Sequence, residues 1–146
     1  MSISTLKIYC CTTLGVVGSF IVKLLGGWSE EMSTLIIFMA VDYVMGLVVA
    51  GVFKNSNKSK SGRLDSRIGW VGLCKKCTTF LFVILSKRLD LLLDTNYILT
   101  ATVIGFIANE AISIIENAGL MGLPLPAVVT KAIEVLRERS ENGNNF

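Results

Sequence analysis

Ionisable side chains interrupt the apolar segments of this 146-residue sequence. Asp42 and the adjacent pair Lys75 and Lys76 each lie near the middle of a long apolar stretch, and Glu110 and Glu116 lie within another. A charge without a partner is costly at the centre of a bilayer, so such groups face one another, a protein interior or water. The chemistry open to them is therefore pairing between helices or the lining of an aqueous path.

The stretch with the two glutamates carries one polar stripe. At about 100° per residue, seven small or polar residues of a helix in this region fall within one arc of roughly 140°. They are Thr102, Gly105, Asn109, Glu110, Ser113, Glu116 and Asn117. We call these residues the polar arc. Phe106 is the only large apolar residue inside it. The arc either packs on partner helices or faces water, and the spacing does not decide between the two.

Other site chemistry has little support in the sequence. Histidine is absent, which excludes Ser-His and Cys-His catalysis and removes the commonest metal ligand. Cys74 and Cys77 have C-x-x-C spacing, but they and Cys10 and Cys11 lie in apolar stretches, which favours small buried side chains over a zinc or redox site. No G-x-G-x-x-G or P-loop motif is present. We expect no metal, no cofactor, no nucleic-acid partner and no enzymatic activity.

The composition predicts an integral membrane protein. Hydrophobic residues make up 52% of the chain and charged residues 17%, and the mean hydropathy is +0.63, too apolar for a soluble domain of this length. We expect an all-α fold with about four transmembrane helices in one domain over residues 1–123. The expected spans are residues 8–28, 34–53, 68–86 and 97–119. A span of twenty residues covers about 30 Å, the hydrocarbon thickness of a bilayer.

Two of the four segments leave alternatives open. The first could be a signal peptide, but Gly26-Gly27-Trp28 stands where a cleavage site would follow, which favours an uncleaved spanning or interfacial helix. The third is the weakest span because Lys75 and Lys76 lie at mid-depth. It could instead lie on the cytoplasmic surface, which would leave three spans and place the C-terminus outside.

A basic loop over residues 54–67 separates the second and third segments. It is rich in Ser, Asn and Gly, and Asp65 is its only anion. Its cations are Lys54, Lys58, Lys60, Arg63 and Arg67. Short basic loops stay in the cytoplasm, so a four-span chain has both termini there. We expect this loop to set the topology and to contact anionic lipids.

The C-terminal region and the small residues predict further helix contacts. Pro124 and Pro126 end the fourth segment, and apolar residues then recur at helical spacing. This pattern predicts a cytoplasmic amphipathic helix over residues 124–139, interfacial or self-associating, and a disordered tail over residues 140–146. Within the spans, small residues four apart allow helices to approach closely. The pairs are Gly46 with Ala50 and Ala101 with Gly105.

Five motifs in order resemble one known family. They are Leu25–Trp28 (LGGW), Asp42–Gly46 (DYVMG), Gly69–Gly72 (GWVG) before the two lysines, Asn109–Asn117 (NEAISIIEN) and Gly122–Pro126 (GLPLP). With the basic loop between the second and third motifs, they resemble the phage-lysis and toxin-secretion holin family of Gram-positive phages and clostridial toxin loci. The resemblance covers roughly residues 20–135.

The resemblance implies a function that composition does not. Holins accumulate in the bacterial cytoplasmic membrane and then oligomerise into lesions that release an endolysin or, in some relatives, a large toxin. It implies that the chain's partner is itself, with endolysin or toxin as released cargo. Some holins also have a second start that yields an inhibitory antiholin, and Met32 is the one internal methionine before the second span. We expect Asp42 and the polar arc to form the surface that changes from paired to hydrated.

Two other classes of function stay open. A small proton- or cation-coupled transporter also needs a carboxylate at mid-span, but it predicts a pocket of aromatic residues, for which Tyr43 and Phe106 are few. A membrane adaptor would use the basic loop to recruit a partner without forming a pore.

Overall fold

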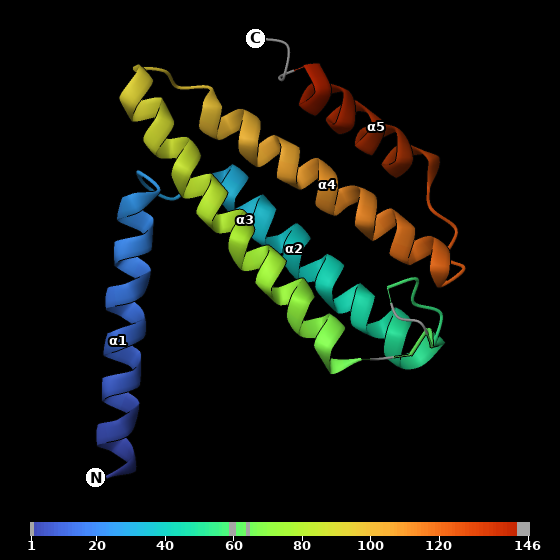
Figure 1. Ribbon diagram of the computed structural model, residues 1–146, viewed down its shortest axis with the longest axis horizontal. Helices are drawn as coiled ribbons and strands as arrows, with labels where there is room; N and C mark the ends of the chain where they lie inside the picture. Colours follow the sequence, from blue (N-terminus) through green and yellow to red (C-terminus); the bar gives the residue numbers. More distant parts are fainter. Residues whose placement is uncertain (1, 59–60, 64, 143–146) are drawn as a thin grey trace.

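The computed structural model describes residues 2–58, 61–63 and 65–142, and over these residues the chain is helical without strands. The elements are α1 (Ile3–Leu24), α2 (Glu30–Val48), the π-helical turn η1 (Val49–Phe53), α3 (Ser66–Leu93), α4 (Ile98–Leu120) and α5 (Ala127–Asn142). Helices α2, α3 and α4 form a bundle in which α2 and α4 run parallel and α3 runs antiparallel to both, and α5 runs back along α4 (Figure 1). This confirms the predicted all-α fold.

Four helices of the described chain are long and apolar enough to cross a membrane: α1, α2 with η1, α3 and α4. The expected number of spans is therefore met by length and composition. Helix α3, the weakest candidate in the sequence, packs in the bundle beside α4 and α2 rather than lying apart from them (Figure 1). This packing favours the four-span arrangement over the three-span one.

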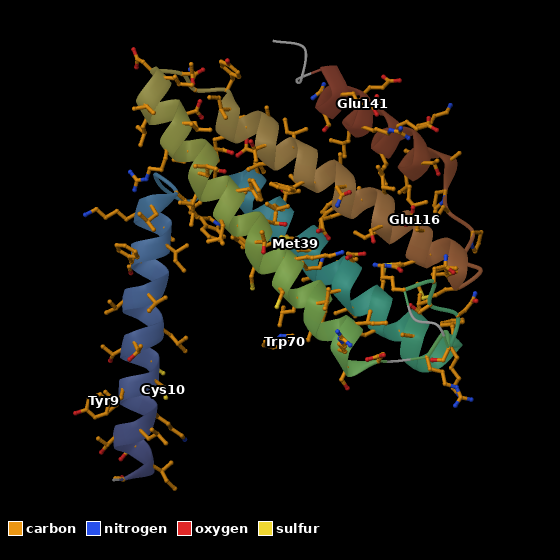
Figure 2. The ribbon with its side chains drawn as sticks, in the orientation of Figure 1. Tyr9, Cys10, Met39, Trp70, Glu116 and Glu141 are labelled. Atoms are coloured by element: carbon orange, nitrogen blue, oxygen red, sulfur yellow. The ribbon has the colours of Figure 1, made fainter. Side chains whose placement is uncertain are left out.

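Helix α1 stands away from the bundle. None of its residues is buried, and Tyr9 and Cys10 project from it without touching the other helices (Figures 1 and 2). The chain then turns at Gly26, whose φ of +77° is unfavourable for other residues, and a Cβ there would lie 2.4 Å from the side chain of Lys87 on α3. An apolar helix with no packed face suits lipid or another protein chain.

The bundle is held by an apolar core from all three helices. Leu25, before α2, joins side chains of α2, α3 and α4 that are almost completely buried: Met32, Leu35, Met39, Val83, Val103 and Ile107. Between membrane helices such side chains contribute through close van der Waals packing rather than through removal from water. The rings of Phe82 and Phe106 also meet, with centroids 6.5 Å apart. This core fixes the rotation of each helix about its axis and hence the direction of its polar side chains.

Helix α3 is longer than predicted. It continues from the expected end at Ser86 to Leu93, so its last two turns contain the residues expected to form a charged connector. The reason lies in Asp90, which is 3% exposed and caps the next helix. Its carboxylate accepts hydrogen bonds from the backbone N–H groups of Ile98 (3.0 Å) and Leu99 (2.9 Å) and from the hydroxyl of Thr95 (2.7 Å).

Helix α5 also differs from the expectation. It continues to Asn142, so residues 140–142 are helical rather than part of a disordered tail, and residues 143–146 lie outside the described part of the chain. Four side chains three or four residues apart are half-buried along it: Thr130, Ile133, Leu136 and Ser140. Since α5 lies along α4 and not beyond its end, its expected place in the cytoplasm stays a prediction (Figure 1).

Candidate functional site

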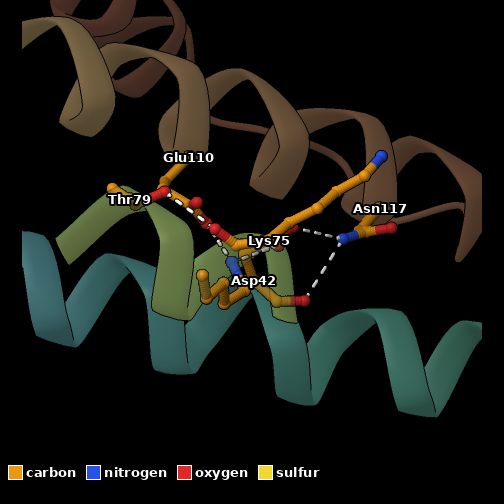
Figure 3. Close-up of polar contacts among 6 residues, drawn as sticks. Asp42, Lys75, Thr79, Glu110 and Asn117 are labelled. Carbon is orange, nitrogen blue, oxygen red and sulfur yellow. Dashed lines mark hydrogen bonds and ion pairs between the residues drawn. The ribbon is translucent and has the colours of Figure 1, made fainter. Parts of the chain in front are cut away.

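Three of the ionisable residues inside the apolar segments meet at one point, which we call the ion cluster. Lys76 of α3 donates to Asp42 of α2, with 2.9 Å between Nζ and Oδ2, and to Oε2 of Glu110 on α4 (Figure 3). The three side chains are 14%, 9% and 10% exposed, respectively. One ammonium therefore links carboxylates from two other helices and holds all three spans of the bundle together.

A second shell of hydrogen bonds surrounds Asp42. The Asn117 amide donates to Oδ1 of Asp42 at 2.9 Å and to its backbone carbonyl at 3.4 Å, and the Ser113 hydroxyl bonds to the same carboxylate. Further along α4, the hydroxyls of Thr102 and Ser86 are 2.8 Å apart. In the described chain no buried side-chain oxygen or nitrogen lacks a hydrogen-bond partner. Polar groups whose hydrogen bonds are satisfied in this way are tolerated where water is excluded.

The ion cluster carries an imbalance of charge. Asp42 and Glu110 are two carboxylates and Lys76 is a single ammonium, so the fully ionised set has a net charge of −1. Removing one partner from a buried ion pair typically costs 3–5 kcal/mol, because it leaves the other charge uncompensated. Removing Lys76 would leave two carboxylates facing each other. The cluster is therefore stable only while its three helices stay in register.

Other predicted site residues lie outside the ion cluster. Glu116 and Asn109 of the polar arc are exposed, and Lys75 is exposed and forms no ion pair within the described chain. Neighbouring residues of a helix point about 100° apart, so Lys75 and Lys76 cannot both face the same partners. The sequence pattern grouped all these residues as one polar set, whereas the structure brings only some of them into the ion cluster and leaves the others exposed.

The small residues do allow close approach between helices. A Cβ at Gly46 would lie 3.9 Å from the Asn117 amide nitrogen, and Ala50 one turn further is buried. These two residues let α2 approach α4 beside the ion cluster. Gly105 faces α5, since a Cβ there would lie 3.3 Å from Oγ of Ser140, and Ala101 is half-buried. The two pairs thus serve two different contacts of α4.

A cavity of about 260 Å³ leads from the basic loop to the ion cluster. It lies between α2, α3 and α4, with Lys58 and Arg63 of the loop and Lys75 of α3 in its lining. The loop is tied to the end of α4 by the Asn55 amide, which donates to the backbone carbonyl of Leu120 at 3.2 Å. The cavity thus connects one end of the bundle with its buried charges.

The remaining loop cations have separate positions. Lys54 ends η1 in a left-handed conformation with φ of +52°. The backbone N–H of Arg67 donates to the carboxylate of Asp65, the N-cap of α3, at 2.8 Å. Lys60 lies outside the described residues. These positions neither support nor oppose a role in topology, which stays a prediction.

Two expectations about cysteines and metals can be compared with the structure. All four cysteines are exposed on the surfaces of α1 and α3, so they are not buried within the bundle, and the expectation of small side chains covered by lipid stays a prediction. Their helices face outward at those positions and nothing in the bundle covers them. Among the described residues, no group of three or more Cys, Asp or Glu side chains is arranged to hold a metal ion.

Sequence reasoning missed two polar residues of the bundle. Asp90 looked like part of a charged connector, and Ser86 looked like the end of a span. Asp90 caps α4 from eight residues upstream, and Ser86 contacts Thr102 sixteen residues away. Capping is recognised in a sequence when the cap directly precedes its helix. No local pattern gives these longer contacts.

Comparison with known proteins decides the family. The model of the bacteriophage holin family matches residues 19–138, most of the chain. The chain belongs to the bacteriophage holin family. A probable holin of Bacillus phage phi105 is 33% identical over 116 residues, which cover 79% of this chain and 80% of that protein. The membrane assignment, the helical fold and the resemblance in the five motifs thus agree.

Other relatives come from bacteria, and their names assign them no role. An uncharacterized protein of Halalkalibacterium halodurans is 38% identical over 78% of this chain and 83% of its own length. An uncharacterized protein of Clostridium perfringens is 32% identical over 91% of this chain and 96% of its own length. No solved structure matches the chain. The relatives are of similar length, so the match concerns whole proteins rather than a shared segment.

Proposed function

We propose that this chain is a holin that oligomerises in the bacterial cytoplasmic membrane and opens pores through which an endolysin leaves the cell. Release of a large toxin is the corresponding role for a member of a toxin locus. The observation that carries the proposal is the ion cluster of Asp42, Lys76 and Glu110, whose charges are paired within one chain. Family membership supports it, because the family is one of lysis proteins.

The ion cluster provides a mechanism for the delay between accumulation and opening. While the three helices stay together, the charges are paired and covered, and the single chain tolerates a lipid environment. If α3 separates from α2 and α4, the charges lose their partners and need water. Many copies that separate together can supply that water by enclosing a common lumen. The polar arc of α4 would then form part of the pore wall.

The position of α5 along α4 must also change before a pore forms. Helix α5 lies along α4, and its outer charges are exposed: Lys131, Glu134, Arg137, Glu138 and Glu141. Ser140 reaches Gly105, seven residues into a helix that is a candidate span. If α4 crosses the bilayer, these charges would face hydrocarbon, which is costly. We therefore assign this position of α5 to the protein before α4 has inserted, and the face with Ala101 and Gly105 to contact with a second copy once α5 has left.

The orientation completes the proposal. With the basic loop in the cytoplasm, α2 ends and α3 begins on the inner side, and four spans place both termini inside. The loop then lies against anionic lipids of the inner leaflet. An antiholin that starts at Met32 would lack α1, a helix with no buried residue. Such a product could still form the ion cluster.

Inducible expression in a bacterial host, together with an endolysin that carries no export signal, tests the proposal. A holin gives growth without symptoms, then an abrupt loss of membrane potential and release of the endolysin. Asp42→Asn and Glu110→Gln should shift the time of that loss, and Glu30→Gln, which changes an exposed carboxylate outside both the ion cluster and the polar arc, is the matched control. Normal timing in both cluster variants would remove the ion cluster from the mechanism.

One observation favours a small transporter as the second candidate. The cavity reaches Asp42 and Glu110 at mid-span and includes Tyr43 and Phe106 in its lining. A transporter would change tolerance to its substrate without releasing the endolysin, and its membrane potential would not collapse at a set time. An adaptor would do neither. The same expression experiment therefore separates all three classes.

A further inference from the structure

The cavity between α2, α3 and α4 has a polar mouth and apolar walls. Lys58 and Arg63 of the basic loop line its mouth, and Leu47, Ile68 and Phe106 line its sides. Its volume of about 260 Å³ is somewhat smaller than typical pockets for drug-sized ligands, so it suits a small polar group. Helices α2 and α3 contact each other less than either contacts α4, and the cavity lies where they diverge.

Two glycines keep this cavity open. A Cβ at Gly69 would lie 3.7 Å from the hydroxyl of Tyr43, and a Cβ at Gly72 would lie 3.9 Å from the ring of the same residue. Larger side chains at these two positions of α3 would fill the space over the tyrosine. Beside Tyr43 the wall that α3 presents to the cavity is therefore made of backbone, and α2 supplies a phenol that can donate a hydrogen bond.

Lys75 is a cation of the bundle that lines the cavity and that the ion cluster does not use. Its side chain lines the cavity, and Figure 3 shows it extending away from Asp42 and Glu110. It forms no ion pair with any described residue, whereas Lys76 has two carboxylate partners. An ammonium inside a membrane segment is stable only beside an anion, a carbonyl or water. The position of Lys75 therefore favours an anion in the cavity.

The depth of Lys75 limits which anion fits. It lies nine residues after Ser66, the first residue of α3, which corresponds to about 14 Å along the helix axis. A lysine at this depth extends its side chain toward the nearer interface, where lipid headgroups lie. Lys58 approaches from the loop on the same side. A phosphate with an attached apolar tail matches both the cations and the walls of Leu47 and Ile68.

We propose that this cavity binds the headgroup phosphate of an anionic phospholipid, with Lys75 and Lys58 as its cationic contacts. The Tyr43 hydroxyl is a further donor, and the acyl chains leave between α2 and α3 for the surrounding bilayer. This deepens the lipid contact of the proposed function. It needs the basic loop at a membrane surface but does not depend on pore formation. A bound lipid would hold α3 apart from α2 at one end of the ion cluster.

Thermal unfolding of the purified full-length protein in detergent tests this site. Phosphatidylglycerol should raise the unfolding temperature in a saturable manner because it binds the folded state. Lys75→Gln should weaken the apparent affinity about tenfold, the effect of losing one charge-assisted contact. Lys131→Gln on α5 is the matched control, since it removes the same charge from an exposed lysine far along the chain from the cavity residues. The control should bind as the unchanged protein does.

Three outcomes would overturn the proposal. Equal stabilisation by phosphatidylcholine would show that the site does not select an anionic lipid. Equal affinity of the Lys75 and Lys131 variants would show that Lys75 is not a contact. Inorganic phosphate that stabilises the protein as well as the lipid does, and competes with it, would assign the site to a free anion.

Gly72→Leu provides an independent variant because it fills the cavity and leaves every charge in place. It should abolish the shift with phosphatidylglycerol, and its unfolding temperature without lipid shows whether the protein still folds. Retained binding in a folded Gly72→Leu protein would place the lipid elsewhere. Lysis is measured separately. Loss of lysis with lipid binding intact contradicts only the proposed function. Loss of lipid binding with lysis intact contradicts only the lipid site.

Discussion

Helix α4 makes two contacts that are built in opposite ways. Against α2 and α3 it contributes Glu110 to a buried ion cluster in which every charge has a partner. Against α5 it offers Gly105 and a strip of half-buried side chains, and the charges of α5 point away. The first contact is hard to open because separating any one of these helices leaves at least one buried charge without its partner. Opening the second contact leaves no buried charge without a partner, so we expect α5 to be the part that leaves first.

The largest effect should follow from removing the shared ammonium. Lys76→Gln leaves Asp42 and Glu110 facing each other, and we expect the free energy of unfolding in detergent to fall by about 3–5 kcal/mol. Lys75→Gln is the matched control, because the adjacent lysine has no ion pair. Titration with a denaturing detergent measures both. Equal losses in the two variants would contradict the division between these lysines.

Neutralising the whole ion cluster should cost less than removing its lysine. In the triple variant Asp42→Asn, Lys76→Gln and Glu110→Gln no uncompensated charge remains, so we expect it to recover more than half of the loss seen with Lys76→Gln alone. The same titration gives the comparison. A triple variant as unstable as the sum of its single variants would show that the three residues do not act as one unit.

A reversible covalent link tests whether α5 must leave α4. Gly105→Cys with Ser140→Cys, with the four natural cysteines replaced, places two thiols where the spacing of 3.3 Å between Cβ and Oγ suits a disulfide. Under oxidising conditions we expect the onset of lysis to be delayed beyond that of either single-cysteine variant. Adding a reductant should restore the normal onset of lysis within one generation. Normal onset of the oxidised protein would mean that α5 stays on α4 in the pore.

The smallest effect should come from weakening the α5 contact directly. Leu136 is half-buried beside the core, so Leu136→Ala should lower the free energy of unfolding by only about 1 kcal/mol. Because this change favours release of α5, it should also advance the onset of lysis. Val128→Ala, on an exposed side of the same helix, is the control. A loss of unfolding free energy as large as that of Lys76→Gln would contradict the difference in strength between the two contacts of α4.

The sequence predicted the helical content and the approximate positions of the four apolar helices, because length and hydrophobicity are properties of each segment alone. It also placed Asp42, Glu110 and Asn117 among residues that need a partner. It ended α3 too early and ended α5 before Ser140. Both errors concern polar residues that look like connectors until their distant contacts are known, as with Asp90 and the N-terminus of α4.

By itself, then, the sequence determined that charges occur at membrane depth and that one face of α4 is polar. Only the tertiary structure decided that Lys76 and not Lys75 completes the ion cluster, and that Glu110 is buried while Glu116 is exposed. The physical reason is rotation. Packing of Leu35, Val83 and Val103 sets the angle of each helix about its axis, and a single residue step of 100° separates a buried partner from an exposed one.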